Sequence, residues 1–222
     1  MESWTHLNFV AVDVETTGLS HETDRIVQVG AVWFADGVAR DRRLWFVDPG
    51  VPISAEASRV TGITAADVAG RPRIEDVNED ILSFVASHYE GALVAYNHRF
   101  DAGFLGNELG RGRQPTGDRR RVLDQLRDQN PIMDPLVFAH ERDRYVKGKR
   151  LGDVASRMGV SVSGQAHAAD YDAEVAGQIA IAYANEGLLP AAFAYTVAIQ
   201  KVLALVQEQR RQAYRESRGG GR

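Results

Sequence analysis

Four carboxylates and one histidine stand at three separated points of the chain, where they could bind metal ions and move a proton. Asp13 and Glu15 close one apolar segment, Asp101 follows another, and His167 and Asp172 lie at the start of a third. Each group alone has an ordinary explanation, such as exposed acids at a strand end or acids that favour a helix dipole. The combination in one domain instead predicts a site that holds two metal ions beside a base.

The chemistry follows from the residue types. Carboxylate oxygens are hard ligands that suit Mg²⁺ or Mn²⁺. Two ions about 4 Å apart can hold a phosphate, activate a water molecule and stabilise a leaving oxygen. His167, with an unperturbed pKa near about 6.5, could accept the proton of that water close to neutral pH. We therefore expect the hydrolysis of a phosphate ester.

The elements that must position these residues can be predicted from apolar patterns. Strands are expected over 8–14, 26–34 and 40–47, joined as an antiparallel meander by a turn at Asp36-Gly37, and shorter ones over 92–96 and 132–134. Side chains of a strand alternate between its faces. Asp13 and Glu15 should therefore share one face of the sheet, with Val12 and Val14 on the other.

Helices are expected between and after these strands, over 54–60, 75–88, 98–109, 151–158, 169–184 and 190–214, with a further one starting at Pro135. Asn97 is expected to cap the helix that carries Asp101. Residues 111–121 and 140–150 are predicted to be basic loops, either merely solvated or holding a nucleic-acid strand. Asp170 and Glu174 flank Asp172, so the sequence leaves open which acid faces the site.

Composition narrows the class of protein further. The 222 residues include no cysteine, which excludes disulfides and thiolate-bound metals, and the formal net charge is −4. That charge argues against a bulk nucleic-acid coat protein but not against an enzyme that grips phosphates through metal ions. No stretch resembles a signal peptide or a membrane span, so a cytoplasmic protein is expected.

Three motifs resemble those of the DEDDh 3′–5′ exonucleases, which share a ribonuclease-H-like fold. They are VDVETTGL (12–19), AYNHRFDAGFL (95–105) and HAADYD (167–172), in the family's order and spacing. The tyrosine of the sister DEDDy group would stand at Ala168, so Tyr171 does not replace His167 as the base. The resemblance covers roughly residues 8–186 and is strongest to the proofreading subunit of bacterial DNA polymerase III and its free-standing relatives.

The resemblance implies a three-layer α/β fold with a mixed five-stranded sheet of order 3-2-1-4-5, flanked by helices. It also implies the release of nucleoside 5′-monophosphates from the 3′ end of DNA, with single strands as the expected substrate and Mg²⁺ or Mn²⁺ as the cofactor. Asp13, Glu15, Asp101 and Asp172 would hold two metal ions, and His167 would be the general base. The implied substrate-binding residues are Thr16, Thr17, Leu19, Glu56, Thr61, Asn97 and Phe100; Thr61 stands where many relatives have histidine.

Several alternatives remain open at this level. An exoribonuclease of the same fold is the nearest rival, and a polymerase-bound proofreading subunit or an inactive nucleic-acid-binding module are others. The expected organisation is a nuclease domain over 1–186, a helix over 187–216 and a disordered tail over 217–222. The helix, with an apolar series of Phe193, Val197, Val202, Leu205 and Val206, would pack on its own domain, form a homodimer or bind a polymerase.

Overall fold

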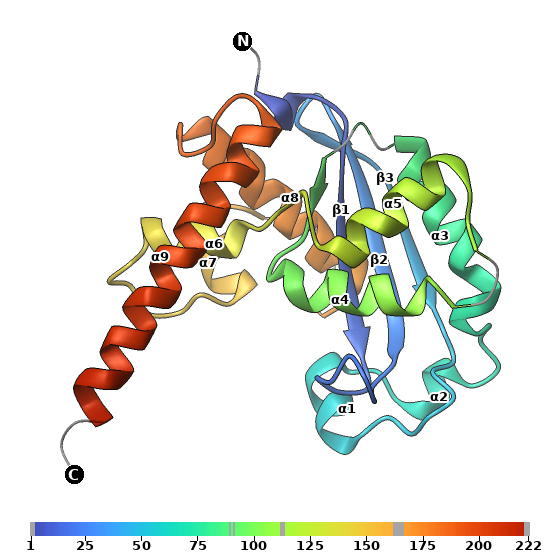
Figure 1. The fold of residues 1–222 in the computed structure, drawn as a ribbon. Coiled ribbons are helices and arrows are strands. Elements are labelled where there is room, and N and C mark those ends of the chain that lie inside the picture. The colour runs from blue at the N-terminus through green and yellow to red at the C-terminus, as the bar shows by residue number, and fades with distance from the viewer. Residues whose placement is uncertain (1–2, 89, 91, 112–113, 162–166, 220–222) are drawn as a thin grey trace.

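A mixed sheet forms the centre of the molecule, in a computed structural model that describes residues 3–88, 90, 92–111, 114–161 and 167–219 (Figure 1). Within these ranges the sheet has five strands in the order β3-β2-β1-β4-β5, as predicted. The strands are β1 (Phe9–Thr16), β2 (Ile26–Ala35), β3 (Val38–Phe46), β4 (Leu93–Val94) and β5 (Ile132–Met133). β1, β2 and β3 pair antiparallel, whereas β4 and β5 run parallel to β1. The predicted meander and its turn at Asp36-Gly37, where both residues have positive φ, are therefore confirmed.

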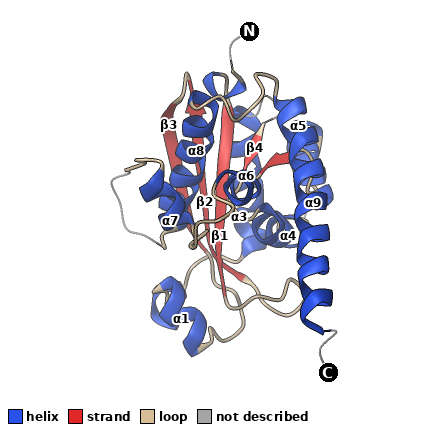
Figure 2. Cartoon of the chain, turned by 90° about the vertical axis from the view of Figure 1, so that its left-hand side faces the viewer, coloured by secondary structure: helices blue, strands red, loops and turns tan. Residues whose placement is uncertain are grey.

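Helices cover both faces of the sheet, so the fold has three layers (Figures 1 and 2). The helices are α1 (Ala55–Thr61), α2 (Ala65–Val68), α3 (Ile74–His88), α4 (His98–Glu108), α5 (Gly117–Asp128), α6 (Pro135–Arg142), α7 (Leu151–Arg157), α8 (Ala169–Asn185) and α9 (Phe193–Gly219). A short 3-10 turn, η1 (Trp4–His6), precedes β1. No helix in the described part of the chain is long and apolar enough to cross a membrane.

The alternation of β1 divides the core into two clusters. Val10, Val12 and Val14 pack with residues of α3, α4 and α5 on one face of the sheet. Phe9 and Ala11 pack with residues of α6 and α8 on the other face. Asp13 and Glu15 continue the second series, so the predicted separation of the acids from Val12 and Val14 is confirmed, and both acids lie on the face that α8 covers.

The boundaries of α1 show how local sequence signals determine an element. The hydroxyl of Ser54 accepts a hydrogen bond from the Ala57 N–H at 3.0 Å, and Gly62 ends the helix in the left-handed region with φ of 73°. A glycine adopts this conformation without steric cost, which is why it stops helices. The hydroxyl of Ser54 also lies 3.4 Å from the carbonyl oxygen of Thr17, so α1 begins beside the loop that follows β1.

The structure differs from the predictions about local structure at three places. Residues 117–121 begin helix α5 instead of ending a basic loop, because Val122, Leu123 and Leu126 of that helix are buried in the core. Asn97 is the N-cap residue of α4, as predicted, but it has φ of 64° and its side chain makes no capping hydrogen bond within the described residues. α9 continues through Gly219, past the predicted start of the tail at 217, and residues 220–222 lie outside the described part.

The inner face of α9 also differs from the prediction. Thr196, Val197, Gln200 and Gln207 are buried, whereas Val202 and Leu205 are 60% and 67% exposed. The predicted apolar series therefore divides between two faces of the helix. α9 packs against α6 and the edge strand β5 through a surface that mixes buried polar side chains with apolar ones such as Val197, and it carries an exposed apolar surface on its outer side.

Candidate active site

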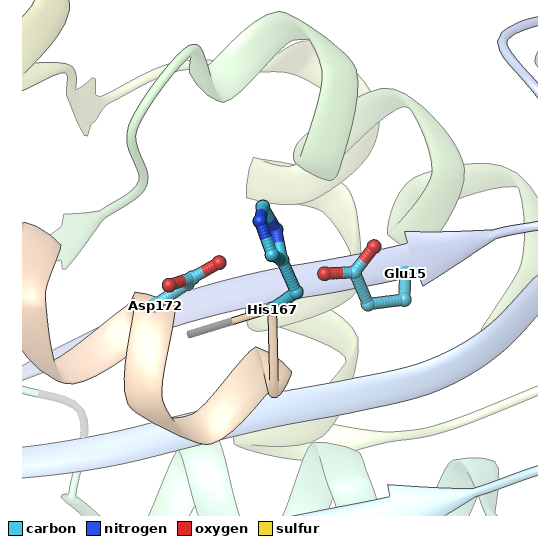
Figure 3. Close-up of side chains that lie close together, drawn as sticks. All are labelled: Glu15, His167 and Asp172. Atoms are coloured by element: carbon cyan, nitrogen blue, oxygen red, sulfur yellow. The ribbon is translucent and has the colours of Figure 1, made fainter. Parts of the chain in front are cut away.

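Glu15, His167 and Asp172 approach one another where β1 ends and α8 begins (Figure 3). Each offers a ligand atom, and these atoms all lie within 4.8 Å of one another. His167 is exposed and has φ of 67°, a left-handed conformation that is uncommon for residues other than glycine. The turn before α8 thereby places the imidazole between the carboxylates of Glu15 and Asp172.

Asp101 reaches the same region from α4. It is 3% exposed, and its Oδ1 accepts a hydrogen bond from the Val14 N–H at 3.1 Å, directly between Asp13 and Glu15 in the chain. This bond fixes the first turn of α4 against the end of β1. Phe104 and Leu105 on the same helix are buried in the core, as expected for a helix that covers the sheet.

The neighbouring acids raise one another's pKa. Burial raises the pKa of Asp13 well above its usual value, and the nearby charges of Asp101, Asp172 and Glu15 raise it further. Burial, and then the charge of Asp172, raise the pKa of Glu15 to about 8. The charges that shift the Asp13 pKa are therefore all negative, so the carboxylates form a crowded group of like charges.

Asp101 and Asp172 have raised pKa values that local donors partly offset. Burial raises the pKa of Asp101, and the Val14 N–H opposes this effect. Burial raises the pKa of Asp172, whereas the charge of His167 and a backbone hydrogen bond from His167 lower it. Crowded, desolvated carboxylates of this kind fit divalent cations, since such ions supply the positive charge and prefer oxygen ligands.

The ambiguity among the acids of α8 is resolved by Arg42 on β3. A guanidinium nitrogen of Arg42 lies 3.6 Å from Asp170 Oδ2, and Arg42 also forms an ion pair with Glu174. These two acids therefore face the antiparallel part of the sheet. Asp172 faces Glu15 and His167 instead.

Gly30 and Gln28 of β2 dock the start of α8, a role that the sequence reasoning did not recognise. Gly30 pairs with Asp13, and a Cβ at this position would lie 2.1 Å from the carbonyl carbon of Ala169. The buried Gln28 pairs with Glu15, and its Oε1 accepts a hydrogen bond from the Ala169 N–H at 2.7 Å. A polar residue and a glycine inside an otherwise apolar strand were the available signals.

The residues implied to bind substrate surround this group in different ways. Leu19 is 84% exposed, on a loop that His21 ties to α4 by a 3.1 Å contact between its Nε2 and the Phe100 carbonyl oxygen. Thr16 and Thr17 are buried, and their hydroxyls bond to Gly18 O at 2.5 Å and Asp24 Oδ1 at 3.0 Å.

The remaining three residues are more dispersed. Glu56 is exposed in the first turn of α1 and lies 3.7 Å from a guanidinium nitrogen of Arg59. Thr61 is buried, and its hydroxyl accepts from the Ile63 N–H at 3.0 Å. Asn97 is half-buried, and its N–H donates to Asp134 Oδ1 at 2.9 Å.

A five-stranded sheet of this order, with helices on both faces, defines the ribonuclease-H-like exonuclease fold that was predicted. The sequence profile of the exonuclease family matches residues 10–180. The chain therefore belongs to this family of nucleic-acid hydrolases, and the enzyme class predicted from the sequence is confirmed.

Curated relatives and solved structures agree with this assignment. The "DNA polymerase III PolC-type" proteins of Clostridium perfringens and of Streptococcus thermophilus are 34% and 35% identical to this chain over 171 and 173 residues. These matches cover 77% of this chain but only 11% of each polymerase.

Two solved structures resemble this chain in fold over most of its length. Exonuclease X in complex with 5′ overhanging duplex DNA has a TM-score of 0.64 and 23% identity, over 86% of this chain and 99% of its own. The nuclease domain of 3′hExo, a DEDDh family member bound to rAMP, has a TM-score of 0.64 and 16% identity, over 85% and 96%.

Proposed function

We propose that this chain is a metal-dependent 3′–5′ exonuclease that hydrolyses the 3′-terminal phosphodiester of single-stranded DNA and releases nucleoside 5′-monophosphates. The observation that carries the proposal is the convergence of four acids and a histidine from β1, α4 and the start of α8. The PolC-type relatives, which are DNA polymerases by name, support DNA as the substrate.

In this proposal Asp13, Glu15, Asp101 and Asp172 hold two Mg²⁺ or Mn²⁺ ions. When bound, these ions would neutralise the scissile phosphate and lower the pKa of a water molecule. Because the four carboxylates have raised pKa values, nearby positive charge is needed to keep all of them ionised, and the metal ions would supply it. The Val14 N–H keeps Asp101 oriented, and the Gln28 side chain keeps the start of α8 in place.

His167 is the proposed general base. Its exposed ring can accept the proton of an attacking water through a ring nitrogen and pass it to solvent. Asp172 and Glu15, whose oxygen atoms lie within 4.8 Å of the ring nitrogen, would stabilise the imidazolium that results. The exposed side chain of Leu19 would contact the terminal base, while the buried Thr16 and Thr17 would act through their backbone.

The test is a panel of 5′-labelled single-stranded DNA, duplex DNA and single-stranded RNA, each with Mg²⁺, Mn²⁺ or EDTA. We expect a ladder of shortened 5′-labelled DNA with either ion and no cleavage in EDTA. A ladder from RNA alone would replace DNA with RNA as the substrate. Shortening from the 5′ end, or cleavage that persists in EDTA, would contradict the proposal.

Matched variants of α8 test the residue assignment. Asp172→Asn should lower cleavage by about 100-fold or more, because it removes a ligand charge and half of its donor oxygens. Asp170→Asn lies two residues earlier and faces Arg42, which keeps its ion pair with Glu174, so the activity of this variant should stay within about threefold of the wild type. Equal effects of the two changes would contradict the assignment.

The exposed apolar surface of α9 is the proposed partner site. Tyr195, Ile199, Val202 and Leu205 lie three or four residues apart, so they share one side of the helix, and each is at least 44% exposed. The surface would bind a second copy of the chain or a polymerase, as the helix 187–216 was expected to do. Light scattering of the wild type and of a Val202→Glu, Leu205→Glu double variant would test the homodimer: a wild-type monomer at micromolar concentration excludes it.

A further inference from the structure

The inner face of α9 places amide side chains where a helix would usually bury apolar ones. Gln200 and Gln207 are 4% and 8% exposed and lie seven residues apart, so both point to the same side of the helix. Each uses its amide to bind the backbone of another element. Gln207 Nε2 donates to the Val137 carbonyl oxygen in α6 at 2.9 Å.

Gln200 substitutes for a missing neighbour of the edge strand β5. On its inner side β5 accepts a hydrogen bond at Met133 O from the Ala95 N–H, at 3.0 Å. Because backbone groups alternate in direction along a strand, the Ile132 carbonyl and the Asp134 N–H point away from β4, toward the open edge of the sheet. Gln200 Nε2 donates to Ile132 O at 2.8 Å, and its Oε1 accepts from the Asp134 N–H at 2.7 Å. One side chain thus pairs with the edge as a residue of a sixth strand would.

Asp134 carries this contact to the start of α4. Its Oδ1 accepts from the Asn97 N–H and the Leu136 N–H, both at 2.9 Å. Its Oδ2 accepts from the His98 N–H at 3.1 Å and lies 3.0 Å from His98 Nδ1. The buried carboxylate therefore ties the residue before α4 and the first residue of α4 to the end of β5.

The segment held in this way is strained and leads directly to Asp101. Asn97 has φ of 64°, a conformation that is uncommon outside glycine and that the hydrogen bonds from Asp134 help to hold. Asp101 follows one helical turn later, and its Oδ1 meets the Val14 N–H at 3.1 Å. Hydrogen bonds therefore link Gln200 through Asp134 to the start of α4, and one turn of that helix leads from there to Asp101.

We infer that Gln200 is a positioning residue for Asp101. Helix α9 therefore belongs to the nuclease domain and supports its active site. The inference rests on the proposed role of Asp101 as a metal ligand. Replacing the amide with an apolar group leaves the Asp134 N–H and the Ile132 carbonyl without their partner. The end of β5 then shifts or opens toward water, and the carboxylate of Asp134 holds Asn97 and His98 less firmly.

The experiment compares Gln200→Leu with Gln207→Leu in the full chain. Both changes remove a buried amide from the same face of α9, but only Gln200 contacts the residue that anchors α4. Amide hydrogen exchange reports on the start of α4 without any metal or substrate. We expect exchange at Asn97 and His98 to rise about tenfold or more in Gln200→Leu and to stay within about twofold of wild type in Gln207→Leu.

Calorimetry with Mn²⁺ gives a second readout. Mutation of residues that orient metal ligands typically lowers metal affinity by about 10–100-fold. We therefore expect Mn²⁺ affinity to fall roughly tenfold in Gln200→Leu and to stay unchanged in Gln207→Leu. The KM for DNA should change less than kcat in that variant. Equal effects of the two variants on exchange and affinity would reduce Gln200 to a helix-docking residue and overturn the inference. So would a folded Gln200→Leu protein with wild-type exchange at Asn97 and His98.

Asp101→Asn separates this inference from the proposed function. If Asp101→Asn keeps wild-type Mn²⁺ affinity and cleavage, the proposed metal site is wrong, and with it the role assigned to Gln200. If Asp101→Asn loses both while Gln200→Leu behaves as wild type, only the positioning role fails.

Discussion

The pKa of Glu15 leads to a prediction about stability in the absence of metal. Burial and the charge of Asp172 raise this pKa from an ordinary value of 4.5 to about 8. The folded protein therefore keeps Glu15 protonated at pH values where the unfolded chain has already lost the proton. A raised carboxylate pKa stabilises the folded state fully below about pH 4.5, and this stability is lost as the pH rises to about 8.

The size of the effect follows from the same shift. Each pH unit between the two pKa values changes the free energy of unfolding by about 1.36 kcal/mol, so the whole window corresponds to at most about 5 kcal/mol. Glu15 is only partly buried, and solvent screening reduces this limit to about 2 kcal/mol. Between pH 6 and 8, which covers over half of the window, the expected loss is about 1–1.5 kcal/mol.

Urea unfolding of the wild type and Glu15→Gln measures this loss, with tryptophan fluorescence as the signal and EDTA in the buffer. Glutamine removes the titration, so the stability of the variant relative to wild type should increase by about 1–1.5 kcal/mol from pH 6 to pH 8. The comparison cancels the other titrating groups to first order. A stability difference that stays constant over this range would refute the reasoning. Saturating Mn²⁺ should stabilise the wild type more than the variant, because it binds the ionised carboxylates.

Three further predictions concern the contacts around this site. Gly30→Ala should lower the free energy of unfolding by about 1–3 kcal/mol and reduce cleavage, since the new methyl group would meet the Ala169 backbone; urea unfolding and the labelled-DNA assay measure the two effects. Gln28→Leu should cost about 1–3 kcal/mol in the same unfolding experiment, because it leaves the buried Ala169 N–H without an acceptor. Binding of Mn²⁺ at pH 7 should release about one proton from Glu15, and calorimetry in two buffers of different ionisation enthalpy counts it; no release would contradict the raised pKa.

The antiparallel part of the sheet could be predicted because its signals are local. The apolar runs of β1 and β2 and the turn at Asp36-Gly37 each lie within a few residues, and the structure confirms them. The strand order and the family came from the resemblance of the three acidic motifs. Helix α5 escaped prediction because Arg119, Arg120 and Arg121 dominate its start, while the apolar residues that hold it in the core come later.

The orientation of α9 could not be predicted from hydrophobicity. Val202 and Leu205 look like the natural inner residues of this helix, yet both are exposed. What the helix meets is the outer edge of β5, and an unpaired strand edge presents N–H and C=O groups. A glutamine satisfies such an edge better than a valine, so Gln200 is buried there. The deciding partner is a backbone edge, which a side-chain pattern does not reveal.

The choice among the acids at the start of α8 depends on a similarly distant partner. Asp170 and Glu174 are four residues apart and share one side of the helix, whereas Asp172 lies on the opposite side, and the helical period alone does not say which side meets the sheet end. Arg42 attracts the first and third from β3, two strands away from β1 in the sheet. Asp172 is thereby left beside Glu15 and His167. Arg42→Glu would put a third acid beside Asp170 and Glu174 in place of their cation. It should therefore repel α8 from β3 and displace the carboxylate of Asp172, although Arg42 itself does not belong to the site.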